Sequence, residues 1–139
     1  MTRTTDVTLH SVLKFSDFLS EERAKEVTDS TQFMGGKWKE LCRQTNFSPN
    51  IAKYIIPVDI GYANFLVLTE VPAGAVTKAH AHDEPMFRYV LSGSLELNNR
   101  SYEAGDWVYV PKNVPYEITT KTGYSTLSGY GQACVEPPT

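Results

Sequence analysis

The sequence is poor in histidine and cysteine and contains no long hydrophobic run. Of its 139 residues, three are histidines and two, Cys42 and Cys134, are cysteines. Two cysteines are too few for the disulfide framework of a small secreted domain, and we expect both to be reduced packing residues. No stretch of about 18 consecutive apolar residues is present, so the pattern predicts no transmembrane helix.

An excess of basic residues is also missing. The 13 lysines and arginines stand against 16 aspartates and glutamates, which gives a formal net charge of −3. Proteins that bind nucleic acids or anionic membranes present a basic patch, and we expect neither partner here. The first ten residues, MTRTTDVTLH, lack the apolar core of a signal peptide. We therefore expect a soluble, cytoplasmic protein whose partner is a small-molecule substrate.

The sequence does contain many short apolar segments separated by turn residues. Hydrophobic residues make up 41% of the chain and aromatic residues 12%, a globular balance whose aromatic share favours β-strands. The strand-like segments are KWKELCRQ, IAKYIIPV, ANFLVLTEV, AVTKAHAH, MFRYVLSGSLELN, RSYEAGDWVYVP, PYEITTKTG and YSTLSGYGQA. Short strands at such regular spacing predict an all-β sandwich or barrel.

One segment near the start has a helical pattern instead. Residues 15–27, FSDFLSEERAKEV, place four apolar side chains near helical spacing, and Ser16 is a candidate N-cap. We therefore divide the chain into an N-terminal arm with a short helix (1–30), a β-barrel (31–133) and a C-terminal tail (134–139).

Two of the three histidines, His80 and His82, stand one residue apart. Side chains alternate between the faces of a strand, so both imidazoles are expected on one face. Imidazole nitrogen is a good ligand for iron, zinc, nickel and copper, and the pair predicts half of a mononuclear metal site. The other interpretation is a polar pair in a pocket that holds no metal.

The segment around this pair resembles the first metal-binding motif of the cupin superfamily. That motif is glycine, five residues, His-x-His, three or four residues, glutamate, six residues and glycine. It is matched here by Gly74, His80, His82 and Gly93, with Met86 at the glutamate position. The resemblance implies an all-β double-stranded β-helix, the jelly-roll cupin barrel, here with an N-terminal arm and one short helix.

The second cupin motif is matched less fully. Gly105 and Pro111 are in place, Asn113 stands for its second glycine, and Pro115 precedes the position of the metal-binding histidine. Tyr116 occupies that histidine position. Together the two motifs cover about the central third of the chain, and the resemblance implies a homodimer.

A narrower resemblance accounts for one of the two departures. HAHDEPMFRYVLSG, residues 80–93, is similar to the corresponding run in acetylacetone-cleaving and 2,4′-dihydroxyacetophenone dioxygenases and in the cupin half of ChrR-type anti-sigma factors. These proteins use three histidines and no glutamate, which accounts for Met86 but not for Tyr116. The resemblance implies one divalent metal ion, Fe(II) first and zinc or nickel next, and oxygen-dependent cleavage of a carbon–carbon bond.

Two residues are candidates for the remaining ligands of such a metal. Tyr116 can bind as a phenolate, or it can act beside the metal as a general acid or base. Its alternative role is a buried aromatic whose hydroxyl finds one partner. Glu84 is a less favoured third ligand, since Asp83 and Pro85 on either side of it suggest a turn in solvent.

Arg88 lies at an unusual position for a charged residue. On a strand that begins at Met86, Arg88 shares the face that the ligands of the family occupy, and a buried guanidinium is costly unless it is paired. It either forms an ion pair with an internal carboxylate such as Glu70 or Glu117, or binds an anionic or enolate substrate. We list it as a catalytic and substrate-binding candidate. The other candidate walls of the pocket are Met86, Phe65 and Trp107.

These residues support three hypotheses of different kinds. The first is a metal-dependent enzyme that acts on a carbonyl or enol compound, with dioxygenase chemistry foremost. The second is a non-oxidative isomerase, cyclase or lyase in which Tyr116 and His82 carry out acid–base steps. The third is a ligand-binding cupin without catalysis.

Overall fold

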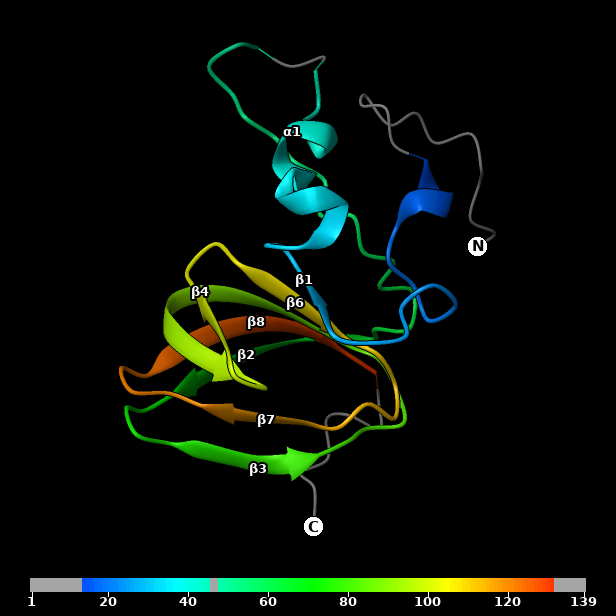
Figure 1. Cartoon of the computed structure of the whole chain (residues 1–139). Helices are drawn as coiled ribbons and strands as arrows, with labels where there is room; N and C mark the ends of the chain where they lie inside the picture. Colours follow the sequence, from blue (N-terminus) through cyan, green and yellow to red (C-terminus); the bar gives the residue numbers. More distant parts are fainter. Residues whose placement is uncertain (1–13, 46–47, 132–139) are drawn as a thin grey trace.

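The twelve-residue strand β4 (Met86–Leu97) belongs to both layers of the structure (Figure 1). Its first half pairs with β6 and β8, and its second half pairs with β5 and β7, all antiparallel. The two layers therefore form one continuous eight-stranded sheet that folds over on itself. This computed structural model describes residues 14–45 and 48–131. The predicted jelly-roll barrel is confirmed.

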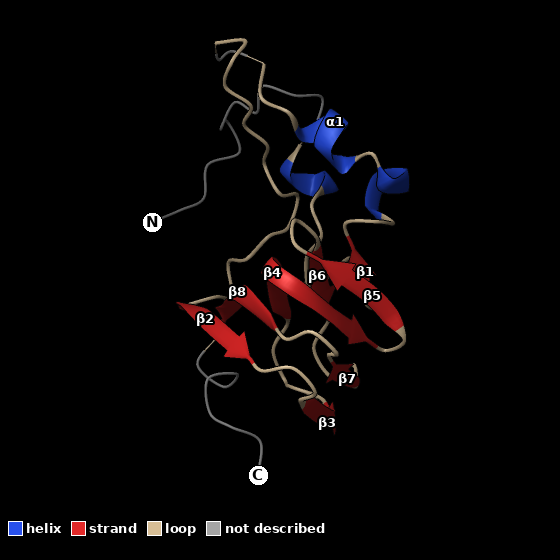
Figure 2. Cartoon of the chain, turned by 90° about the vertical axis from the view of Figure 1, so that its left-hand side faces the viewer, coloured by secondary structure: helices blue, strands red, loops and turns tan. Residues whose placement is uncertain are grey.

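The other elements are short. The strands are β1 (Thr28–Asp29), β2 (Phe65–Val71), β3 (Val76–His80), β5 (Arg100–Glu103), β6 (Trp107–Val110), β7 (Tyr116–Thr119) and β8 (Tyr124–Tyr130). The helical pieces are the 3₁₀ turns η1 (Phe15–Asp17) and η2 (Phe33–Gly36) and the helix α1 (Trp38–Cys42). When the molecule is turned, β3 and β7 lie as a separate layer below the strands β2, β8, β4, β6 and β1 (Figure 2).

The barrel encloses an apolar core between these layers. Side chains that alternate along β4 are buried, and they meet the inner faces of β5, β6, β7 and β8. The buried members of this core are Met86, Val90, Leu95, Leu97, Tyr102, Val108, Val110, Tyr116, Ile118 and Tyr124. The inner face thus follows the two-residue period of the sequence, as the alternating strands predicted.

A second core lies outside the barrel, between β6 and the residues that precede β2. Trp107 and Tyr109 on β6 are buried against Leu19, Trp38 and Val58. The rings of Trp38 and Trp107 meet edge to face, with their centroids 5.8 Å apart. In Figure 1, α1 stands above β6 and β1, so the segment between the arm and β2 covers the outer face of the sheet.

The helix predicted over residues 15–27 does not form beyond the three-residue turn η1. Leu19 forms a parallel bridge with Val58, and its backbone N–H donates to the carbonyl of Pro57 at 2.9 Å. This pairing takes the backbone groups that a helix needs. Moreover, Ala24 is the only buried residue between residues 21 and 26, so a helix there has no apolar face to bury.

Two predicted strands before the barrel are also wrong. KWKELCRQ contains the helix α1, because Trp38 and Cys42, four residues apart, are the pair that it buries. IAKYIIPV is irregular and contributes bridges at Tyr54 and Val58 alone. Residues of this region, among them Trp38 and Val58, therefore cover the barrel from outside, and the first long barrel strand begins at Phe65.

Several other expectations concern the rest of the chain. Cys42 is a free, fully buried cysteine, and burial raises the pKa of its thiol to about 11, so it is an inert packing residue. Cys134 and the tail predicted at 134–139 lie outside the described residues.

Within residues 14–45 and 48–131, no helix is long and apolar enough to cross a membrane. The homodimer stays a prediction.

The bend in β4 depends on Gly93. This residue has φ +72°, in the left-handed region, and a side chain there would overlap the carbonyl oxygen of Gly123 and lie 2.8 Å from the Cα atom of Tyr124. Both constraints exclude a Cβ atom. The first motif thus carries a glycine at the point where β4 passes from one layer to the other, next to the register shift between Val90 and Ser92.

Substitution of this glycine should destabilise the fold strongly. Gly105 is the matched control, because it has φ +95° but open space where a Cβ would lie. We expect Gly105→Ala to cost about 1–3 kcal/mol through backbone strain alone. Gly93→Ala should cost at least about 2 kcal/mol more, because backbone atoms must also move. Urea unfolding measures both, and equal costs would contradict this account of the bend.

Candidate functional site

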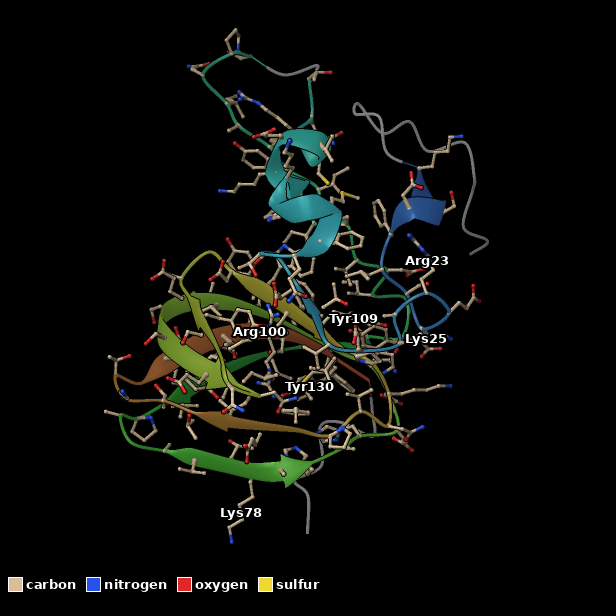
Figure 3. The ribbon with its side chains drawn as sticks, viewed as in Figure 1. Arg23, Lys25, Lys78, Arg100, Tyr109 and Tyr130 are labelled. Carbon is tan, nitrogen blue, oxygen red and sulfur yellow. The ribbon has the colours of Figure 1, made fainter. Side chains whose placement is uncertain are left out.

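His80 is the last residue of β3 and lies on the inner side of the barrel. The register between β3 and β7 shifts between Thr77 and His80, so both of these side chains are partly buried while Lys78 points away into solvent (Figure 3). The ring nitrogen Nδ1 of His80 lies 2.7 Å from the carbonyl oxygen of Lys78. Because a carbonyl only accepts, Nδ1 carries the proton and Nε2 presents its lone pair to the site.

His82 lies just beyond the strand and is held by the second motif. The backbone N–H of Asn113 donates to the carbonyl of His82 at 2.6 Å. Asn113 has φ +63°, a left-handed conformation that asparagine tolerates better than most residues, which explains how it replaces the glycine of the motif. The Nε2 atoms of His80 and His82 are 3.2 Å apart. The predicted pairing of the two imidazoles is therefore present, although only His80 belongs to the strand.

His82 is a neutral base in this environment. Burial lowers its pKa, and electrostatic interactions with His80 and Arg88 lower it further, against a smaller opposing effect of Asp83. A lowered pKa leaves the imidazole unprotonated at neutral pH, with one nitrogen available as an acceptor.

Tyr116 lies directly across from His80. The two residues are paired between β7 and β3, and the centroids of their rings are 4.7 Å apart. The phenol is 2% exposed. Its hydroxyl accepts a hydrogen bond from Nη2 of Arg88 at 3.2 Å and donates to the sulfur of Met86 at 3.5 Å. The hydroxyl therefore points into the barrel, past the histidines, toward β4.

Arg88 is buried on the inner face of β4, where it is 5% exposed. Burial opposes its charge, yet the phenols of Tyr130 and Tyr116 raise its pKa, so it stays protonated. The predicted ion pair with Glu70 or Glu117 is absent. Both carboxylates are exposed residues that alternate with the inward-facing residues of β2 and β7.

The donor set for a metal is half complete. The two Nε2 atoms, 3.2 Å apart, would both be within reach of one metal ion with metal–nitrogen bonds of about 2.1 Å. Catalytic zinc and non-haem iron sites use three protein ligands. In the described part of the chain, no third histidine, cysteine, aspartate or glutamate joins His80 and His82. Glu84 instead lies against Gly131, and the Tyr116 hydroxyl is hydrogen-bonded to Arg88 and Met86. The residues present do not make a complete metal centre.

The predicted pocket walls divide between the two sides of the sheet. Met86 is buried on the inner face beside Tyr116. Phe65 pairs with Tyr130 on the inner face at the end of β2 and is 49% exposed, so it lies at the rim of the barrel. The prediction for Trp107 is wrong. Its ring is fully buried in the outer core, because its position on β6 places it opposite Tyr89 rather than opposite Arg88.

Sequence reasoning missed a row of hydroxyl groups on β8. Tyr124, Thr126, Ser128 and Tyr130 alternate along the strand, and Ser128 is the direct neighbour of Arg88 on β4. Thr126 and Ser128 are fully buried. The signal in the sequence is the two-residue period of hydroxyl side chains in YSTLSGY, which differs from the apolar inner face of the other strands.

Comparison with known proteins finds one matching family model and several similar structures. Residues 67–124 match the family model described as the cupin domain. The chain is similar in fold to an RmlC-like cupin from Shewanella frigidimarina, with 22% identity and a TM-score of 0.46 over 63% of this chain and 91% of that one. It is also similar to the structure of the anti-sigma factor ChrR with SigE from Rhodobacter sphaeroides (17% identity, TM-score 0.42, 60% of this chain and 46% of that one).

A further similar structure is a mutant salicylate 1,2-dioxygenase from Pseudoaminobacter salicylatoxidans in complex with gentisate. It shares 20% identity at a TM-score of 0.43, over 54% of this chain and 23% of that one. These likenesses concern the fold alone. A comparison with curated proteins finds no match.

A histidine at position 116 should complete the metal site. Tyr116→His places a third imidazole across from His80, and we expect the affinity for Ni²⁺ or Zn²⁺ to rise about tenfold or more. Isothermal titration measures this gain. The matched control is the same substitution in a His80→Ala background, which should gain nothing. An unchanged affinity would show that position 116 does not face the histidines in solution.

The lowered pKa of His82 should make stability depend on pH. In the unfolded chain this imidazole takes up a proton near pH 6.5, whereas in the folded chain it does so at a lower pH. Its contribution to stability is therefore complete above the unfolded pKa and is lost as the pH falls below it. In urea unfolding with EDTA present, the wild type should lose more stability on acidification than His82→Gln. Equal losses would contradict this environment for His82.

Proposed function

We propose that the chain is a cupin enzyme that transfers protons on a small carbonyl or enol compound. Tyr116 is the acid and His82 is the base in this proposal. One observation carries it: inside the barrel, the Tyr116 hydroxyl lies between a buried guanidinium and a thioether, beside two converging imidazoles.

The surroundings of Tyr116 suit a proton donor. A thioether is a weak acceptor, so a carbonyl oxygen of a substrate can replace the Met86 sulfur as the acceptor of the phenol proton. When the phenol gives up that proton, negative charge develops on its oxygen. The guanidinium of Arg88 already donates to this oxygen and stabilises the charge.

The complementary step requires a base next to the same substrate. Neutral His82 can take a proton from the carbon beside the carbonyl, while Tyr116 protonates the carbonyl oxygen, and the product is the enol. The reverse transfer, with the proton returned to another carbon, gives an isomerisation. Nε2 of His80, which carries no proton, accepts a hydrogen bond from Nε2 of His82 and so holds that imidazole in place.

The donor set favours this reaction over the carbon–carbon cleavage that the narrower resemblance implied. In that subgroup three histidines hold the metal, whereas here Tyr116 occupies the third position and its hydroxyl is bonded to Arg88. A ligand-binding cupin without catalysis is the remaining alternative, and it differs in having no turnover.

Deuterium exchange provides a test that does not require the natural substrate. An enzyme that forms an enol should exchange the CH₂ protons of 2-oxobutyrate or of its neutral analogue 2,3-pentanedione with D₂O, which NMR detects. Tyr116→Phe should slow the exchange about 10²–10⁴-fold, the usual contribution of a positioned acid or base. The control is Tyr89→Phe, on the outer face of the same layer, which should leave the rate unchanged.

Two outcomes would overturn the proposal. Exchange of neither compound above the rate in buffer would indicate a binding protein or a different reaction. Exchange that disappears in EDTA and returns with Fe²⁺ or Zn²⁺ would assign the chemistry to a metal on His80 and His82 rather than to the side chains alone.

A further inference from the structure

The interior of the barrel contains several buried polar groups without a hydrogen-bond partner. In the described part of the chain, these include Nε of Arg88, Oγ1 of Thr126 and Oγ of Ser128. Buried polar groups are almost always hydrogen-bonded in native proteins, and each exception requires an explanation. Three exceptions close together suggest a shared ligand.

The pairing of the strands brings these groups to one place. Arg88 on β4 is the direct partner of Ser128 on β8, and Val90 is the direct partner of Thr126, so all of them share the inner face. Tyr130 continues this row toward the rim and lies between the two layers of the barrel (Figure 3). The groups thus form a polar patch behind Tyr116, within an otherwise apolar core.

This patch carries one uncompensated positive charge. The groups that interact most strongly with Arg88 are the phenols of Tyr130, Tyr116 and Tyr124 rather than carboxylates. No described carboxylate forms an ion pair with it, whereas Asp29 pairs with the exposed Arg100. Water can satisfy the hydrogen bonds of the two hydroxyls, but it cannot compensate a buried charge. An organic anion does both.

We propose that Arg88, Ser128 and Thr126 form a carboxylate-binding subsite. Arg88 offers one buried cation, which balances the single charge of a carboxylate. A phosphate, with about two charges at neutral pH, exceeds it. The Nε–H of Arg88 has no acceptor at present, and the planar guanidinium matches the two oxygens of a carboxylate. The hydroxyls of Ser128 and Thr126 donate to the same group.

The position of this subsite also defines the substrate, given the proton-transfer function proposed above. Nη2 of Arg88 is 3.2 Å from the hydroxyl of Tyr116, so the carboxylate and the carbonyl that they bind must be near neighbours in one molecule. Only one or two bonds can separate their carbon atoms. The substrate class is therefore a short 2-oxo or 3-oxo acid, or its enol.

Binding of the matched pair of probes tests the subsite independently of turnover. NMR titration should show that 2-oxobutyrate binds at least tenfold more tightly than 2,3-pentanedione, in which an acetyl group replaces the carboxylate, while inorganic phosphate does not compete. Arg88→Met should remove this preference, so that the two probes bind with equal, weak affinity. Because the variant loses an unpaired buried charge, its melting temperature without ligand should not fall.

A second variant keeps the charge of Arg88 and tests the hydroxyl group of Ser128. Ser128→Ala should weaken the binding of 2-oxobutyrate several-fold. The matched control is Ser125→Ala, since Ser125 lies on the outer face of the same strand and contacts Ser92. Equal affinity for the two probes, or a marked loss of thermal stability in Arg88→Met, would overturn the subsite, the latter by showing that an internal group compensates the charge of Arg88.

The two proposals fail in different ways. If 2-oxobutyrate binds through Arg88 but its protons do not exchange, the carboxylate subsite stands and the proton-transfer function falls. If 2,3-pentanedione exchanges and 2-oxobutyrate shows no preference in binding, the function stands and the subsite falls.

Discussion

The structure depends on the sharp bend in β4. Because Gly93 lets the backbone take a left-handed conformation against Gly123, one strand serves both layers of the barrel. The half of β4 before the bend then lies between β6 and β8 with Met86 and Arg88 on its inner face. A glycine that binds nothing thus determines where the polar side chains of the site can lie.

The contact between Arg88 and Tyr116 joins the two layers across the interior. Arg88 belongs to the layer of β4, β6 and β8, and Tyr116 to the layer of β3 and β7. Elsewhere the layers meet through apolar packing, which tolerates small shifts. A charge-assisted hydrogen bond fixes direction as well as distance, so it orients the phenol relative to the histidines at the rim.

The sequence predicted those parts of the site that depend on strand parity. A period of two placed Met86 and Arg88 on the inner face, and the spacing of the motifs brought His80, His82 and Tyr116 together. Parity within one strand does not give its register against its neighbours, which is why Trp107 was assigned to the wrong side.

Tertiary contacts decided the remaining parts. The helix predicted over residues 15–27 does not form because Leu19 pairs with Val58, which lies far away in the sequence. In the same way, Ser128 becomes informative only when it lies beside Arg88, because a serine in a strand has many ordinary explanations. Long-range pairing of this kind is not encoded in any local period.

The two departures from the cupin motifs, Met86 and Tyr116, have one common explanation in the positive charge of Arg88. Arg88 acts on His82 electrostatically and disfavours positive charge there, so it also opposes a divalent cation on the two histidines. A glutamate at position 86 or a histidine at position 116 would strengthen a metal site that this charge weakens. With Met86 and Tyr116 at these positions, the guanidinium of Arg88 is the positively charged group inside the barrel. In that position it can stabilise an enolate or a phenolate, the role that a metal ion has in other enzymes.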